Sequence, residues 1–311
     1  MFYKNALRQT IEHSMDVLFS DVQESSFMEN YAVARFFFKK KIQYKSLDTQ
    51  VLKVKCKLRV LRICTILEET VVEYVLFYTF LLKKESCIYQ EEGQFCHCAV
   101  FTKGILIKDA SMEKEGYLEE QLLLIDCFNY EDINFYKQPE KIQHMREPNQ
   151  QRGGYDALAA VKYAERYWND HHFAYPVFAN DCTNFISQCL YAGGAKMHGE
   201  SRTSGWWIRN GSWSYSWTTA HALYLYLKHA KSGLRGVFVS DPRELLLGDI
   251  ICYDFEGDGR FNHTTIVVNK NAEGEPFVNA HTTNSRQRFW SYTDSTAYTP
   301  NIQYAWIQIH I

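Results

Sequence analysis

The chain has 311 residues, which is long enough for two domains of ordinary size. It is 46% hydrophobic and 23% charged, with a formal net charge of -2, as in many globular proteins. This near-neutral balance gives no electrostatic reason to expect nucleic acid or an anionic membrane as a partner.

The N-terminal segment lacks the uninterrupted apolar run of a signal peptide, because Arg8, Glu12 and Asp16 interrupt it. The longest apolar stretch, from Thr70 to Leu82, contains Glu73 and is too short to span a bilayer. The sequence therefore predicts no membrane insertion and a cytoplasmic protein. Non-classical export and association with spores are left open.

An α+β domain is predicted for residues 1–137. Residues 4–40 have the apolar spacing of a helix, and residues 51–60 alternate with the period of a half-buried strand. Further strands are expected over 70–82 and 95–100, which together would form a curved antiparallel sheet. No nucleophile, base and acid gather in this region, so we expect a scaffold or interaction domain of unknown role.

Residues 138–152 are predicted to be a linker, because they carry two prolines and many polar side chains that could bury little. The second domain would then occupy residues 153–311. It opens with a helix over about 155–169, whose apolar side chains recur on one face.

The nine cysteines are odd in number and irregularly spaced. Cys96-His97-Cys98 is the one tight cluster, and it lacks the C-x2-C or C-x4-C pairs typical of zinc sites. A disulfide framework is also a poor fit for a chain that can form its own cores. We therefore predict reduced thiols, no metal and no cofactor.

The stretch "NDCTNFISQ", residues 180–188, places a cysteine at the start of a predicted helix. Asp181 can cap that helix, and a thiol in its first turn feels the positive end of the helix dipole. That environment lowers the pKa of a thiol and can hold an oxyanion, so Cys182 is a candidate nucleophile. The alternative is a buried structural thiol, which is how we interpret Cys189.

Two predicted strands carry the histidines that could serve as base and orienting group. One strand begins at His263 and the next ends at His281. If the hairpin folds about Glu273-Gly274, His281 lies across from Ile266, and whether it shares a face with His263 depends on the register. A polar group on the neighbouring strand is how a catalytic histidine is commonly oriented.

The second domain resembles the putative amidase domain family of bacteria, a branch of the papain-like, NlpC-type cysteine hydrolases. The resemblance covers residues 153–311 and rests on these motifs: Asp181–Gln188 with Gly193-Gly194, Gly248–Ile251, His263–Val267, and Ala280–Thr282. Tryptophans also fall where the family places them, at Trp206, Trp213 and Trp217.

The resemblance implies a papain-like α+β fold in which the nucleophile begins a helix packed on an antiparallel sheet. It implies Cys182 as nucleophile, His263 as general base and then acid, and His281 as the third, orienting member. Asn279 is the alternative for that third role. The backbone N–H of Cys182 would stabilise the oxyanion, with a further hydrogen bond from Tyr175.

Two other features have competing interpretations. The tryptophans Trp206, Trp207, Trp213 and Trp217 either line a substrate cleft or pack the segment between helix and sheet. Residues 254–259 resemble the first half of a calcium loop, but Thr265 stands where the bidentate glutamate is required. We therefore expect a solvated acidic loop there.

The sequence thus predicts a cysteine-dependent amidase or peptidase that acts through an acyl-enzyme. Its substrate would be a peptide-like amide, such as a peptidoglycan fragment from the cell wall. An acyltransferase with the same triad, or an inactive module that binds peptide or glycan, remains an alternative. The oligomeric state is not predicted.

Overall fold

The computed structural model describes residues 2–20, 30–85, 87–112 and 154–311. The chain forms two compact units, Met1–His144 and Met145–Ile311, each with its own hydrophobic core. The α+β class predicted from the sequence is confirmed, since helices and antiparallel strands occur in both units. The predicted linker, residues 138–152, lies outside the described residues, so its position stays a prediction.

The predicted N-terminal helix is wrong in its extent. Helix α1 (Phe2–Asp16) ends where Val17 and Leu18 donate hydrogen bonds to carbonyls three residues earlier, which tightens the last turn. A separate helix, α3 (Ala32–Ser46), follows after residues 21–29, which are not described. In the first turn of α3, the N–H of Val33 donates to the Asp109 carboxylate at 2.9 Å.

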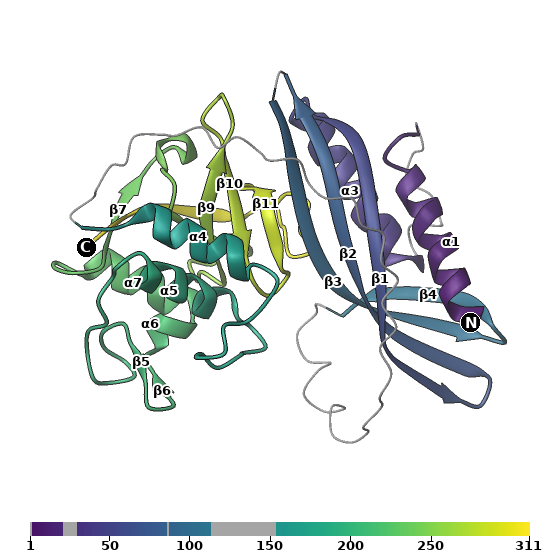
Figure 1. Cartoon of the computed structure of the whole chain (residues 1–311), viewed down its shortest axis with the longest axis horizontal. Coiled ribbons are helices and arrows are strands. Elements are labelled where there is room, and N and C mark those ends of the chain that lie inside the picture. Colours follow the sequence, from purple (N-terminus) through teal and green to yellow (C-terminus); the bar gives the residue numbers. More distant parts are fainter. Residues whose placement is uncertain (1, 21–29, 86, 113–153) are drawn as a thin grey trace. The chain divides into compact units, whose positions relative to one another are not determined.

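The sheet of the first unit is an antiparallel meander in chain order (Figure 1). Its strands are β1 (Gln50–Ile66), β2 (Glu69–Lys84), β3 (Cys87–Thr102) and β4 (Ile105–Ser111). The three predicted strands are confirmed, although each is longer than expected. The sequence analysis missed β4, which pairs with β3.

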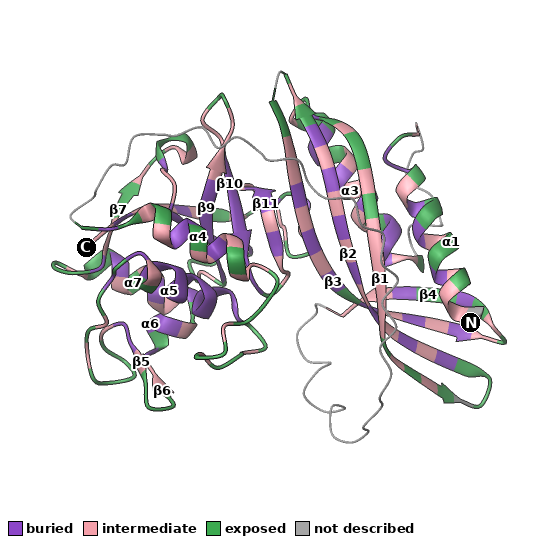
Figure 2. Ribbon diagram, in the orientation of Figure 1, coloured by how far each residue is buried: buried purple, intermediate pink, exposed green. Residues whose placement is uncertain are grey.

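Alternation along β2 and β3 builds the core of this unit, as the purple and pink bands of Figure 2 show. The inward side chains of β2, including Tyr74 and Phe80, pack with Phe37 of α3. Tyr78 lies opposite Gly93, where an added Cβ would stand 2.2 Å from the Tyr78 hydroxyl. Glycine is therefore required at position 93 for the Tyr78 ring to fit.

One ion pair and one contact between a histidine and a carboxylate are buried in this core. The ammonium of Lys40 contacts the carboxylate of Glu91, which also accepts a 3.0 Å hydrogen bond from Tyr44. His97 points inward to Asp109, with its Nδ1 2.9 Å from both carboxylate oxygens. Alternation along β3 places Cys96 and Cys98 on the opposite face from His97, so these three side chains do not converge on a metal.

The second unit is built on an antiparallel sheet of order β11-β10-β9-β8-β12-β7. These strands span β7 (Arg235–Val239), β8 (Ile250–Asp254), β9 (His263–Lys270), β10 (Pro276–Ala280), β11 (Ser285–Phe289) and β12 (Gln303–His310). The predicted strands that carry His263 and His281 correspond to β9 and β10, whereas β7, β11 and β12 were missed.

Helices cover one face of this sheet (Figure 1). They are α4 (Ala157–Tyr167), α5 (Cys182–Ala192), α6 (Tyr215–Thr218) and α7 (Ala220–His229); the unit also holds a short hairpin, β5 (Ile208–Arg209) with β6 (Ser212–Trp213), and a 3-10 turn, Pro242–Glu244. A second apolar cluster covers the opposite face, so β8 is buried along its whole length.

None of the helices in the described segments combines the length and hydrophobicity that a membrane-spanning helix needs.

We predict that Glu91→Ala lowers the free energy of unfolding of the first unit by about 3–5 kcal/mol, because it removes the carboxylate that the buried Lys40 ammonium contacts. Hydrogen exchange of the α3 amides in increasing urea measures this. Glu92→Ala, on the opposite face of the same strand, is the matched control and should change stability by less than about 0.5 kcal/mol. A loss as large for Glu92→Ala as for Glu91→Ala would contradict the prediction.

Candidate functional site

Helix α5 begins at Cys182, as predicted, but the predicted capping by the Asp181 side chain is wrong. Asp181 occupies the N-cap position, but its carboxylate makes no capping hydrogen bond to the backbone N–H groups of the first turn. Thr282 takes that role instead: its Oγ1 lies 3.2 Å from the backbone nitrogens of both Asp181 and Cys182. Thr282 has φ of +83°, a left-handed conformation that is costly for a β-branched residue.

The Asp181 carboxylate is buried and binds three other groups. Oδ2 lies 2.7 Å from Nδ1 of His281. Oδ1 accepts hydrogen bonds from the Asn184 side chain at 2.8 Å and from the Phe178 N–H at 3.2 Å. These bonds compensate the cost of burying the charge and fix the chain immediately before Cys182.

Both ring nitrogens of His281 are hydrogen-bonded. Nδ1 faces the Asp181 carboxylate, and Nε2 lies 2.7 Å from the carbonyl oxygen of Tyr167. Each ring nitrogen is thus occupied by an oxygen of another residue. The ring also stacks on Phe185, with centroids 3.9 Å apart. His281 is therefore bonded to α4 and α5, and no hydrogen bond links it to His263.

His263 begins β9 and points to the face of the sheet opposite α5. Its ring lies among Tyr253, Phe255 and Tyr292, which belong to the apolar cluster on that face. Nε2 is 3.3 Å from the Tyr292 hydroxyl. Burial, aided by the positive charge of Arg288, lowers the pKa of His263 from 6.5 to about 3, so the imidazole is neutral near pH 7.

The starts of α5 and β9 lie together. The hydroxyls of Thr183 and Thr264, which directly follow Cys182 and His263, are 3.0 Å apart. Within the described residues, however, no hydrogen bond joins the Cys182 thiol to His263. The thiol is instead 3.7 Å from the Thr183 hydroxyl.

The other two buried thiols of this unit are in unreactive surroundings. Burial raises the pKa values of both Cys189 and Cys252 well above the ordinary value. A thiol that stays protonated is a poor nucleophile. Cys189 also belongs to the hydrophobic core, as the sequence predicted.

The predicted register of the β9–β10 hairpin is wrong by two residues. Asn279, and not His281, lies across from Ile266. Pro276 pairs with Lys270, which is already one residue from the predicted register, and the pairing shifts by one more between Phe277 and Val278. The Asn279 side chain donates to Glu165 at 2.9 Å and accepts from the Gln287 N–H at 2.8 Å. It is therefore bonded to α4 and β11 and does not orient His263.

Trp206 and Trp217 are fully buried, which favours packing over the alternative of a substrate cleft. The indole N–H of Trp206 donates to Ser187 and that of Trp217 to Asn184, both at 2.9 Å. These bonds attach the segment after α5 to the helix itself. The two tryptophans are thus part of the support beneath the start of α5.

Of the other predicted cleft residues, Trp207 is buried, and its indole N–H donates to the carbonyl of Ser201. Trp213 is half-buried and packs edge-on against Phe178, with centroids 4.9 Å apart. It is the one tryptophan of the four that retains a surface for a ligand. Tyr175 stacks on Trp217 and makes no hydrogen bond to the start of α5 in the described residues.

The sequence analysis missed Thr282, Tyr292 and the groups around Tyr292. The guanidinium of Arg288 lies 3.9 Å from the Tyr292 ring centroid and pairs with Asp294 at 2.8 Å. Thr282 stands beside His281 in the quoted family motif, which was the one signal that could have identified it. Tyr292 lies in an irregular loop whose local sequence carries no such signal.

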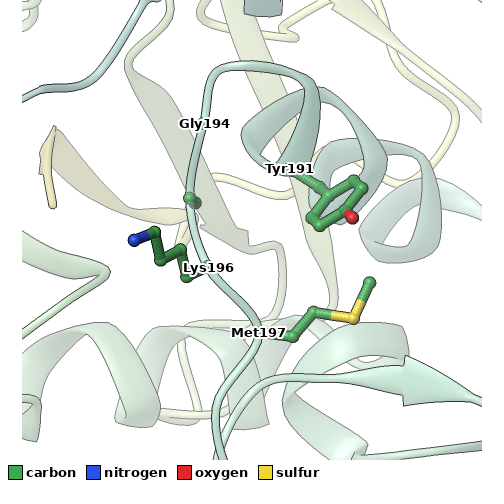
Figure 3. Close-up of a pocket in the computed structure, with 5 residues that line it drawn as sticks. Tyr191, Gly194, Lys196 and Met197 are labelled. Carbon is green, nitrogen blue, oxygen red and sulfur yellow. The ribbon is translucent and has the colours of Figure 1, made fainter.

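A surface cavity of about 390 Å³ lies at the other end of α5 from Cys182. Figure 3 shows Tyr191, Lys196 and Met197 at its wall, with the Lys196 ammonium directed away from the Tyr191 ring. An 11-residue helix is about 16 Å long, so this cavity does not include the Cys182 thiol.

Metal-binding potential within the described residues is confined to one group of three side chains: His171, Asp181 and His281, with one ligand atom of each within 4.8 Å of the others. In the loop of residues 254–259, the first acidic residue bonds to the loop backbone. Asp254 uses both carboxylate oxygens to accept N–H groups of its own loop, including those of Gly257 and Gly259.

Comparison with known proteins gives a family match and two relatives. The putative amidase domain family matches residues 154–307. An uncharacterized protein of Bacillus subtilis (strain 168), YhbB, is 47% identical over 243 residues, covering 77% of this chain and 74% of YhbB. A second uncharacterized protein of that strain, YjcM, is 33% identical over 140 residues, covering 42% of this chain and 32% of YjcM.

No solved structure gives a significant match to the chain. The matched family residues include the whole of α5 and its surroundings, and the similarity to YhbB covers most of both proteins. The chain belongs to the putative amidase domain family, and the helix that begins at Cys182 lies within its family domain.

Proposed function

We propose that the protein is a cysteine-dependent amide hydrolase that works through an acyl-enzyme on Cys182. The observation that carries this proposal is the thiol in the first turn of α5, within the residues that match the family. The packing of that helix on an antiparallel sheet is compatible with a papain-like arrangement, which we propose for this unit.

An oxyanion site is the second part of the proposal. The N–H groups of Asp181 and Cys182 converge on a single oxygen, the hydroxyl of Thr282, which is an exposed residue. Two backbone donors aimed at one position are the arrangement that stabilises a tetrahedral oxyanion. In the proposed reaction the substrate carbonyl oxygen replaces the Thr282 hydroxyl, beside the Cys182 thiol.

We assign the general base to His263 and not to His281. Both nitrogens of His281 are occupied, by the Asp181 carboxylate and the Tyr167 carbonyl, so neither is placed to accept the Cys182 proton. His263 is neutral, and its Nε2 can donate to Tyr292, which leaves Nδ1 as the basic nitrogen. The assignment requires the start of β9 to move so that this ring reaches Cys182, and hydrogen bonds of catalytic groups often form only in the substrate complex.

In the proposed cycle the Cys182 thiol loses its proton to His263 as sulfur attacks the carbonyl carbon. The protonated His263 then gives that proton to the leaving amine, and water activated by the same imidazole hydrolyses the thioester. An amine in place of water would give acyl transfer. We propose peptide-like amides, including peptidoglycan stem peptides, as the substrate class, on the strength of the family match.

A binding module is the second candidate function. It is favoured by the side chain of His263, which lies on the opposite face of the sheet from α5. Binding of peptides or glycans by the protein, with no hydrolysis of them, would support this candidate.

The first prediction concerns Cys182. Cys182→Ala should abolish release of amine from peptide-amide and muropeptide libraries, with a loss of at least about 1000-fold, since Cys182 carries the acyl group in the proposed cycle. Chromatography of the products with mass detection measures this. Cys189→Ala, seven residues along the same helix, is the matched control and should keep its activity. Equal activity of Cys182→Ala and the unmodified chain would show that Cys182 is not the nucleophile.

The second prediction concerns the proton on His263. Its folded pKa of about 3 lies below the ordinary 6.5, so the unfolded chain binds more protons between those values. The contribution of His263 to the free energy of unfolding is therefore fully present above pH 6.5 and is lost as the pH falls toward 3. Imidazole NMR resonances, assigned by comparison with His263→Gln, should show His263 neutral at pH 5. A midpoint near 6.5 or higher would refute this and would indicate a charged His263.

A further inference from the structure

We propose that His171, Asp181 and His281 form a binding site for a divalent transition metal ion of the Zn²⁺ type. The three side chains come from the loop after α4, the N-cap of α5 and the end of β10. Their ligand atoms lie within 4.8 Å of one another. Two imidazoles and one carboxylate are a ligand set that Zn²⁺ accepts and that Ca²⁺ and Mg²⁺ do not prefer.

The distances around the Asp181 carboxylate are close to those of a metal site. Its Oδ2 is 2.7 Å from Nδ1 of His281 and 3.6 Å from Nδ1 of His171. Ligands of a tetrahedral zinc ion, with bonds of about 2.0–2.1 Å, stand about 3.3 Å apart. Movements of no more than about 1.5 Å would therefore give three coordination bonds, with the ion between the carboxylate and the two imidazoles.

The second layer of contacts already orients the ligands as metal sites require. The Nε2 of His281 is 2.7 Å from the Tyr167 carbonyl, which is the common outer partner of a metal-bound histidine. The other carboxylate oxygen of Asp181 is held by Asn184 and by the Phe178 N–H. Asp181 and His281 are thus fixed before any ion arrives.

His171 gives the ion a path into the site. Its side chain is 41% exposed, whereas those of Asp181 and His281 are almost completely buried. The ion can therefore reach the two buried ligands from the solvent side of His171 and keep an open position there for water. Binding would join the loop that carries His171 to the residue that precedes Cys182.

The test is isothermal titration of the full chain with Zn²⁺, using His171→Ala and the matched control His172→Ala. We expect one ion per chain for the unmodified protein and for His172→Ala, and binding at least tenfold weaker for His171→Ala. His171 is exposed and outside the hydrophobic cores, so its replacement should leave the fold intact, which circular dichroism checks. The same titrations in the Cys182→Ala background need no activity, so their outcome is independent of the proposed hydrolase.

A second readout is limited proteolysis of the loop between α4 and α5. Zn²⁺ should slow cleavage there in the unmodified chain and in His172→Ala, and should have no effect in His171→Ala. Zinc binding that is equally strong in His171→Ala would assign the ion to other residues, such as the exposed thiols of Cys87 and Cys96, and would overturn the proposal. Absence of binding to the unmodified chain would overturn it as well.

Discussion

The position of Cys182 depends on one interaction, the buried hydrogen bond between the Asp181 carboxylate and His281. A carboxylate that is withdrawn from water must be fully bonded, and Asp181 achieves this with partners before it, after it and 100 residues away. The residue that precedes the thiol therefore has little freedom. Breaking this bond would remove a 2.7 Å contact from a buried carboxylate, which is more costly than losing a contact on the surface.

The end of β10 completes the same assembly. His281 binds the carboxylate, and the next residue, Thr282, accepts the first two N–H groups at the start of α5. One short segment thus supplies both the hydrogen-bond partner of Asp181 and the residue that caps α5. The strained backbone at Thr282 lets two consecutive side chains reach the same helix end. His281 reaches the Asp181 carboxylate, and Thr282 reaches the N–H groups of Asp181 and Cys182.

Much of this architecture is encoded locally. An alternating pattern predicted β1, local composition and turns predicted β2, β9 and β10, and the "NDC" segment predicted where α5 begins. Side-chain periodicity and helix starts are short-range properties. The partners of the polar groups could not be predicted in this way. The turn and one irregularity in the β9–β10 pairing each shifted the register by one residue, and alternation along β9 placed His263 on the face away from α5. Both outcomes depend on tertiary packing.

The central claim is that Cys182 forms a covalent acyl-enzyme. It is tested most directly by quenching the reaction of the full chain with a peptide thioester or activated anilide in acid and mapping the adduct by mass spectrometry. The account predicts an acyl group on the peptide that contains Cys182. This group should form at a higher rate than an acyl group on any other cysteine. Turnover with no adduct at Cys182, or an acyl group on another residue at the same rate, would contradict it.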